Sequence, residues 1–220
     1  MEYGNSRHIE PEQADEQEDS SIFLSIGDLM SGLLMFFALL FVTALVQIQE
    51  LKDNRNVFIG TLIEELNGND LEVSVNPETG DISIRESILF ADGSAELTKR
   101  GQIFLKKFIP LYSQVIFSNS KFEEQVSRVV IEGHTSSKGS EDYNLELSLE
   151  RSLSVSRYIM FTQMKFPTKQ KFNQKLLASG RGEMDAEQKR DTPADRKVLF
   201  RFQFKGDELL FKQIAARKSP

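Results

Sequence analysis

One continuous apolar stretch, from Ile22 to Val46, constrains this chain more than any other feature of its sequence. Its 25 residues contain a single formal charge, Asp28. A helix rises by about 1.5 Å per residue, so the stretch is long enough to cross a hydrocarbon layer of about 30 Å. We therefore predict a transmembrane helix over residues 22–46.

A cleaved signal peptide is the competing interpretation of an apolar segment this close to the N-terminus. It would need basic residues before the apolar run and a small-residue cleavage site. Residues 1–21 instead hold seven acids against one arginine, Arg7. We expect the helix to stay attached, preceded by an unstructured acidic tail in the cytoplasm.

The single acid of the membrane segment, Asp28, lies six residues after Ile22. A carboxylate inside a membrane costs about 2.5 to 3.5 kcal/mol on insertion scales, so it should face protein or a wet cavity rather than lipid. Gly27, Ser31 and Gly32 let a second helix or water approach it. We hypothesise that Asp28 carries an ion. The alternative places it among lipid headgroups near the start of the helix.

Composition excludes several classes of function. With 33 acids against 27 lysines and arginines, the net charge is −6, so we expect no nucleic-acid partner. The chain has no cysteine and only two histidines, so we expect neither a metal site nor a cofactor. No nucleophile paired with a base and no phosphate-binding loop is evident, which argues against an enzyme.

A helical stripe continues beyond the membrane segment, in residues 47–70. Four apolar positions and one basic position recur there at spacings that alternate between three and four, which is typical of a short parallel helix pair. This pattern predicts a helical linker in the periplasm and a homodimer formed through residues 44–66. The helix should end at Asn67, Gly68 and Asn69. The stripe consists of Ile48, Leu51, Arg55, Phe58 and Leu62.

Residues 71–206 are expected to form one α+β domain, and residues 207–220 a C-terminal tail that includes a short amphipathic helix. Strand and helix patterns alternate along the domain, which indicates a two-layer α/β sandwich around one core. The predicted strands are 71–75 and 82–84 as a hairpin, then 128–131, 176–179 and 198–204, with helices at 97–118 and 143–161.

Two motifs resemble known families. The segment GDLMSGLLMFFALLF resembles the membrane helix of MotB-family stator subunits, in which the aspartate carries the ion. FADGSAE at 90–96 and IEGHTSSKGSEDYNLELSLERSLSVSRYI at 131–159 resemble the opening and the peptidoglycan-binding signature of OmpA-like domains. ASGRGE at 178–183 and DRKVLFRF at 195–202 fit the same domain. Two unrelated motifs in the right order are more specific than either alone.

The OmpA-like resemblance implies a site for diaminopimelate, the zwitterionic residue of the peptidoglycan stem. Arg151 would hold its carboxylate through the planar guanidinium. Tyr143, Asn144 and Leu147 would shape the groove. Ser136 stands where the family has aspartate, so the ammonium group would fall to Ser136 itself or to Glu141 or Asp142.

Two of these assignments have structural alternatives. Arg151 could instead be an exposed helix residue in a charge-rich region. His134 is expected to be a structural turn residue that hydrogen-bonds to the backbone rather than a catalyst.

The acidic tail and the whole layout resemble the B-subunit family of the Zorya anti-phage defence system. Flagellar stator subunits usually carry a basic tail, so they are the second choice. The resemblance implies a multi-pass, MotA-like A subunit as partner, with a pentamer around a dimer of this chain. It also implies a single-pass protein of the inner membrane with its C-terminal domain in the periplasm, bound to peptidoglycan.

One charge pattern favours the opposite orientation. Lys52 and Arg55 are the basic residues nearest to the membrane segment, and the positive-inside rule would place them in the cytoplasm. We nevertheless predict a periplasmic domain, because peptidoglycan lies only there and because a partner subunit can dictate insertion.

Two further functions are compatible with parts of the pattern. A passive tether between membrane and wall would need the helix and the domain but no buried acid. TolR-like and ExbD-like subunits share the membrane aspartate but lack the signature formed by Tyr143, Asn144, Leu147 and Arg151.

Overall fold

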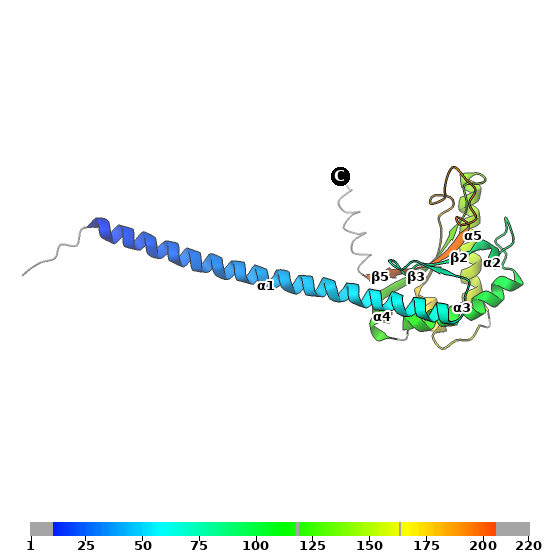
Figure 1. The fold of residues 1–220 in the computed structure, drawn as a ribbon, viewed down its shortest axis with the longest axis horizontal. Helices are drawn as coiled ribbons and strands as arrows, with labels where there is room; N and C mark the ends of the chain where they lie inside the picture. The colour runs from blue at the N-terminus through cyan, green and yellow to red at the C-terminus, as the bar shows by residue number, and fades with distance from the viewer. Residues whose placement is uncertain (1–10, 118, 163, 206–220) are drawn as a thin grey trace, which may run out of the picture. The chain divides into compact units, whose positions relative to one another are not determined.

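The computed structural model describes residues 11–117, 119–162 and 164–205. The predicted C-terminal tail at 207–220 and the first ten residues of the acidic tail lie outside this part of the chain. The chain divides into two compact units, Met1–Asp53 and Asn54–Pro220. Figure 1 labels α1 and most of the helices and strands of the second unit.

Helix α1 runs from Pro11 to Gly68. Proline suits a first helical position because it has no N–H to leave unpaired, and the acids that follow favour the positive end of the helix dipole. The predicted unstructured tail is therefore wrong for residues 11–21, whose Glu, Gln and Ala residues propagate an existing helix well. The helix ends at Gly68, within the predicted stop.

The apolar part of α1 is the one helix in the described residues that is long and apolar enough to cross a membrane, with a mean hydropathy of 2.5 over 18 residues. Every side chain from Phe23 to Val46 is exposed in this chain. Such a surface is covered either by lipid or by another protein.

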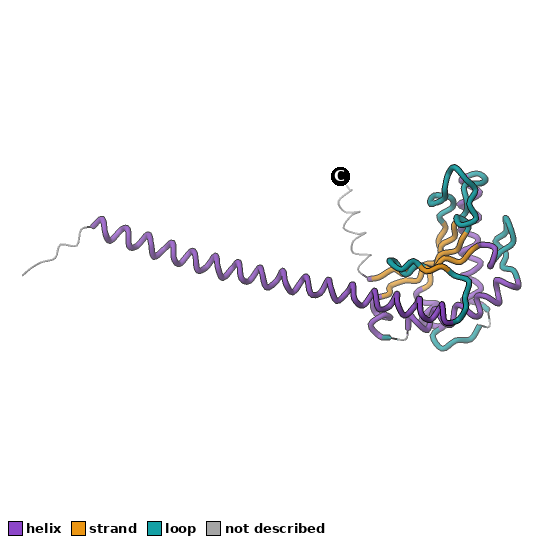
Figure 2. The backbone as a smooth tube through the Cα atoms, viewed as in Figure 1, coloured by secondary structure: helices purple, strands orange, loops and turns teal. Residues whose placement is uncertain are grey.

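The second unit is built on one five-stranded sheet (Figure 2). The strand order is β1-β2-β5-β3-β4; β3 and β4 are parallel and the other pairs antiparallel. The strands are β1 Ser74–Val75, β2 Ile82–Arg85, β3 Val126–His134, β4 Leu176–Gly180 and β5 Lys197–Phe204. The helices are α2 Glu86–Leu89, α3 Lys99–Phe117, α4 Ser120–Gln125, α5 Glu141–Phe161 and α6 Lys169–Lys175.

This arrangement confirms the predicted α+β sandwich. Phe200 of β5 packs edge to face against the rings of Phe108 and Tyr112 of α3, with ring centroids 5.0 and 5.5 Å away. On the same sheet, Gly133 lets α5 approach β3 closely, since a Cβ there would lie 2.1 Å from the Ser148 carbonyl oxygen. Strand β3 extends beyond the predicted 128–131 because β5 pairs with it as far as His134.

The end of α1 belongs to the domain and not to a separate linker. Phe58 and Leu62, which the stripe assigned to a dimer contact, are 1% and 0% exposed within their own chain. The Phe58 ring lies 4.8 Å from that of Phe202, edge to face. The domain therefore starts at Asn54 rather than at residue 71, and a dimer contact over 44–66 cannot use these two side chains.

Arg55 also lies within the domain. Its guanidinium sits 5.0 Å from the centroid of the Phe204 ring. The residue is half-buried, so it serves packing as well as charge at the membrane boundary.

Candidate functional site

A pocket of about 500 Å³ brings together all five residues that the sequence predicted for a binding site. They come from two segments, the turn after β3 and the first three turns of α5. The five are Ser136, Tyr143, Asn144, Leu147 and Arg151.

The start of α5 sets the positions of four of them. Ser140 caps the helix, its hydroxyl accepting from the Tyr143 amide at 3.3 Å. Gly139 before it has a φ of 117°, a conformation that side-chain-bearing residues rarely adopt. Because residues three and four apart share one face of a helix, the four residues from Tyr143 to Arg151 point the same way.

Arg151 is buried in the pocket wall, with 1% of its surface exposed. Its Nη2 donates to Glu86 Oε1 at 2.7 Å and its Nε to the Ser94 carbonyl at 3.0 Å. The guanidinium also lies 5.5 Å from the Phe90 ring centroid. The alternative of an exposed helix residue is therefore wrong, and two of the guanidinium nitrogens are bound to the protein itself.

Glu86 is the main residue that sequence reasoning missed. It is the first residue of α2 and only 6% exposed. Besides its bond to Arg151, it lies 3.5 Å from Arg196 Nε through its second oxygen, Oε2. Its position in the apolar run from Ile82 to Phe90 was the available signal, because an acid within such a run is often buried and paired.

Ser136 has an acidic neighbour, but not the one expected. Asp191 hydrogen-bonds with Ser136 and pairs with Arg196, whose Nη1 lies 3.4 Å from the Ser136 hydroxyl. The hydrogen bond with Ser136 and the charges of Arg196 and Lys138 lower the pKa of Asp191, whose side chain is exposed. This carboxylate is therefore ionised at neutral pH.

The two acids proposed from the sequence lie elsewhere. Asp142 lines a separate hollow beside Leu145 and Leu149, and Glu141 does not line the pocket. Both are in the first turn of α5. Asp191 comes instead from the loop between β4 and β5, which only the fold brings to Ser136.

The remaining predicted residues differ in exposure. Asn144 is 2% exposed and its amide donates to Glu183. Leu147 is 8% exposed and supplies apolar wall. Tyr143 is 47% exposed at the rim, where a ligand would meet it first.

Charge in the pocket is balanced. Three acids and three bases line it, and four of the six are paired within the wall. A balanced lining suits a zwitterionic ligand, since a polyanion or a polycation would face repulsion from half of it. The six are Glu86, Asp92 and Asp191 against Lys138, Arg151 and Arg196.

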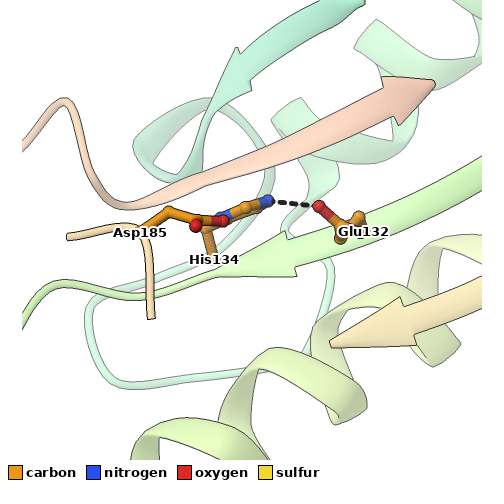
Figure 3. Close-up of side chains that lie close together, drawn as sticks. All are labelled: Glu132, His134 and Asp185. Carbon is orange, nitrogen blue, oxygen red and sulfur yellow. Dashed lines mark hydrogen bonds and ion pairs between the residues drawn. The ribbon is translucent and has the colours of Figure 1, made fainter. Parts of the chain in front are cut away.

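A second charged cluster surrounds His134 at the end of β3 (Figure 3). His134 is 3% exposed; its Nε2 lies 2.9 Å from Glu132 Oε1 and its Nδ1 lies 3.7 Å from Asp185 Oδ2. Its partners are side chains, so the expectation of a turn residue bonded to the backbone is wrong. The imidazole lies between the two carboxylates and is hydrogen-bonded to Glu132.

This cluster is also the described group that most resembles a metal site, with ligand atoms within 4.8 Å of one another. Its geometry does not fit one ion well, because the two carboxylates approach opposite nitrogens of the ring. Each carboxylate also has an arginine: Arg201 lies 3.4 Å from Glu132, and Arg181 lies 3.1 Å from Asp185. The carboxylates are neutralised by these cations without a metal.

The electrostatics of the cluster favour charged carboxylates. Burial raises the pKa of Glu132, but the hydrogen bond from His134 and the charge of Arg201 outweigh it and lower the pKa overall. The hydrogen bond from Arg181 lowers the pKa of Asp185.

Asp28 lies in the other unit, exposed on α1. Within the described residues it has no hydrogen bond or ion pair, whereas the nearby Ser31 hydroxyl donates to the Gly27 carbonyl of its own helix at 2.7 Å. A Cβ added at Gly27 or Gly32 would meet nothing within 4 Å. The helix therefore offers a small-residue surface next to a carboxylate that has no partner among the described residues.

Comparison with known proteins places these sites in context. The model of the OmpA family matches residues 89–198, half of the chain, and this range contains all five predicted pocket residues. A solved structure described as a putative MotB-like protein from Desulfovibrio vulgaris matches 72% of this chain and 96% of its own, with 20% identity and a TM-score of 0.51. That likeness shows the fold.

Two curated relatives from strains of Escherichia coli carry the name Zorya protein ZorB. One is 28% identical over 93% of this chain and 88% of its own length. The other is 24% identical over 64% of this chain, and the match spans 65% of its length. These relatives confirm the resemblance to Zorya B subunits.

Proposed function

Because the chain belongs to the OmpA family, whose model covers residues 89–198, we propose that it is a stator-like subunit that anchors an ion-driven membrane complex to peptidoglycan. One observation carries the proposal. The five residues expected to bind the wall, scattered from Ser136 to Arg151, line a single pocket with balanced charge.

The ligand that suits this pocket is the diaminopimelate side chain of the peptidoglycan stem, which carries an ammonium and a carboxylate together. Arg196 and Lys138 supply positive charge on the accessible side, and Arg151 reinforces it from inside the wall. Tyr143 at the rim and Leu147 in the wall supply apolar contact for the methylene chain.

The membrane part of the proposal rests on α1. Its exposed apolar stretch spans the inner membrane once, with the tail in the cytoplasm and the domain in the periplasm. The orientation follows from the proposed ligand, because peptidoglycan lies only in the periplasm.

The partner is a multi-pass, MotA-like subunit, arranged as a pentamer around a dimer of this chain. The unpartnered carboxylate of Asp28 and the small residues around it supply the surface for that subunit. Phe58 and Leu62 are occupied by the chain's own core, so the dimer contact lies N-terminal to Asn54.

The mechanism follows from the charge of Asp28. An ion that neutralises the carboxylate removes its cost in the membrane interior and changes which contacts α1 prefers. A potential of 100 mV supplies about 2.3 kcal/mol per elementary charge, enough to bias such a step. Rotation between the subunits then produces torque, since the pocket holds this subunit to the wall.

The biological setting that we propose is anti-phage defence. The names of the two curated relatives support it over a flagellar role. A passive tether remains the second candidate, and the fully exposed apolar helix is compatible with it. The two differ in what they require of Asp28, since a tether does not need its carboxylate.

Phage protection in cells that carry the complete operon tests the proposal. Asp28→Asn and the double variant Tyr143→Ala/Leu147→Ala should each abolish protection at membrane levels equal to those of the unmodified chain. Protection by Asp28→Asn equal to that of the unmodified chain would leave the passive tether as the better account.

A further inference from the structure

Two buried oxygen atoms of the pocket have no hydrogen-bond donor among the described residues. They are Oε2 of Glu86 and Oγ1 of Thr135. The two residues are 6% and 3% exposed, and both line the pocket. A buried acceptor without a donor costs free energy, so a pair of them in one pocket needs an explanation.

Strand register places the two residues at the same end of the sheet. Arg85 of β2 and His134 of β3 both pair with Lys197 of β5. Glu86 and Thr135 each come one residue later, on either side of Arg196, and the Glu86 amide donates to the Arg196 carbonyl at 3.0 Å. The two acceptors therefore flank one strand end at the edge of the pocket.

The cations nearby do not satisfy these atoms. Arg151 binds the other oxygen of Glu86, Oε1, and Arg196 directs its Nη1 to Asp191 and Ser136. Arg196 Nε lies 3.5 Å from Glu86 Oε2, close enough for attraction but without a hydrogen bond. What the two oxygens lack is a donor, and a positively charged donor suits a carboxylate best.

We propose that Glu86 and Thr135 form the subsite for the ligand's ammonium group. A primary ammonium has three N–H donors; one goes to Glu86 Oε2 and one to Thr135 Oγ1. The carboxylate beside it then faces Arg196 and Lys138. The site thus selects the free amino-acid end of diaminopimelate, an inference that rests on the proposed function.

This assignment explains why Ser136 can replace an acid. Its hydroxyl is already bonded with Asp191, and Asp191 Oδ1 is bound by Arg196, so both residues already have partners in the wall. Glu86 brings the negative charge to the pocket from α2, a different element. Arg151 acts as a positioning residue, since its bond to Oε1 holds the carboxylate in place while Oε2 has no hydrogen-bond donor.

Sedimentation of the purified full-length chain with isolated peptidoglycan sacculi tests this subsite. One batch of sacculi keeps its free amines and a second has them acetylated, which removes the positive charge. We expect the unmodified chain to bind acetylated sacculi on the order of tenfold more weakly, the scale of one charge-assisted hydrogen bond. Free diaminopimelate should compete, and its N-acetylated form should not.

Two variants locate the effect. Thr135→Val keeps the shape of the side chain and removes a hydroxyl that has no hydrogen-bond partner. The stability of this variant should therefore be unchanged, while its preference for sacculi with free amines falls several-fold. Glu86→Gln should abolish the preference. Thr61→Val, whose hydroxyl bonds to its own helix, and Glu72→Gln, in an exposed ion pair, are the matched controls and should keep it.

The outcomes separate this inference from the proposed function. No binding of the unmodified chain to either batch would overturn wall anchoring itself. Equal binding to both batches, or an unchanged preference in folded Thr135→Val, would overturn the ammonium subsite and leave the anchor standing; the oxygens would then be satisfied by water alone. If Glu86→Gln does not fold, Thr135→Val decides.

Discussion

The pocket and the membrane stretch of α1 handle charge in opposite ways. In the pocket, Arg151 and Glu86 are 1% and 6% exposed, and they are bound to each other at 2.7 Å. On α1, Asp28 is exposed among apolar side chains, with no partner in the described part of its own chain. The pocket pair is satisfied within one chain, whereas the Asp28 carboxylate has no partner among the described residues.

Mutations in the pocket and mutations at Asp28 should therefore have different effects. Changes in the pocket should be measurable as stability and as binding by the isolated full-length chain. Changes at Asp28 should leave both untouched and become visible only in the assembled complex.

The largest effect is expected from Asp28→Asn. It should abolish ion-dependent activity in the assembled complex while sacculus binding by the purified chain stays at the level of the unmodified protein. Ser31→Ala, which removes a hydroxyl already bonded to its own helix, should retain activity. Parallel binding and activity assays on the same preparations provide the check. A loss of sacculus binding by Asp28→Asn would contradict the independence of Asp28 and the pocket.

Arg151→Ala should cost about 3 to 5 kcal/mol of unfolding free energy, because it removes the hydrogen-bonded partner of the buried Glu86 carboxylate and leaves only Arg196, 3.5 Å away. Arg100→Ala removes an exposed pair with Glu72 and should cost at most about 1 kcal/mol. Urea unfolding of the full chain in detergent measures both. Equal losses would contradict the burial of the pocket pair as described.

Leu62→Ala should cost about 2 to 5 kcal/mol, since Leu62 is fully buried in the domain core. Leu34→Ala, on the exposed apolar part of the same helix, should leave domain unfolding unchanged. The same urea experiment compares them. A Leu62→Ala variant as stable as the unmodified chain would favour the interpretation of this part of α1 as a contact between two chains.

A smaller effect is expected from acid. Glu132 and Asp185 have lowered pKa values in the folded chain, so they stabilise it above their ordinary pKa values, and that contribution is lost as the pH falls through the folded values. The urea midpoint should therefore fall between about pH 5 and pH 3. In Glu132→Gln this acid dependence should be weaker; a steeper fall in the variant would argue against the assignment.

Much of the architecture was readable from local pattern. The alternation of Val198, Phe200 and Phe202 predicted a strand with one buried face, and all three are buried. The family motifs predicted which residues of the turn and of α5 would share a site, because a helix carries their spacing into space.

What the sequence did not reveal depends on contacts between distant segments. Glu86 and Asp191 reach the pocket from α2 and from the β4–β5 loop, and no local spacing links them to Ser136 or Arg151. The stripe that ends in Phe58 and Leu62 has the period of a helix pair, but a helix packed on its own domain has the same period. Periodicity gives a buried face and does not say what buries it.

Ion flux through the assembled complex tests the central claim most directly. Proton and sodium flux would be followed in cells that express this chain with its multi-pass partner, comparing the unmodified chain with Asp28→Asn at equal membrane levels. The account predicts an ion current, for one of the two ions, that is absent with Asp28→Asn. Flux through Asp28→Asn equal to that of the unmodified complex would contradict it.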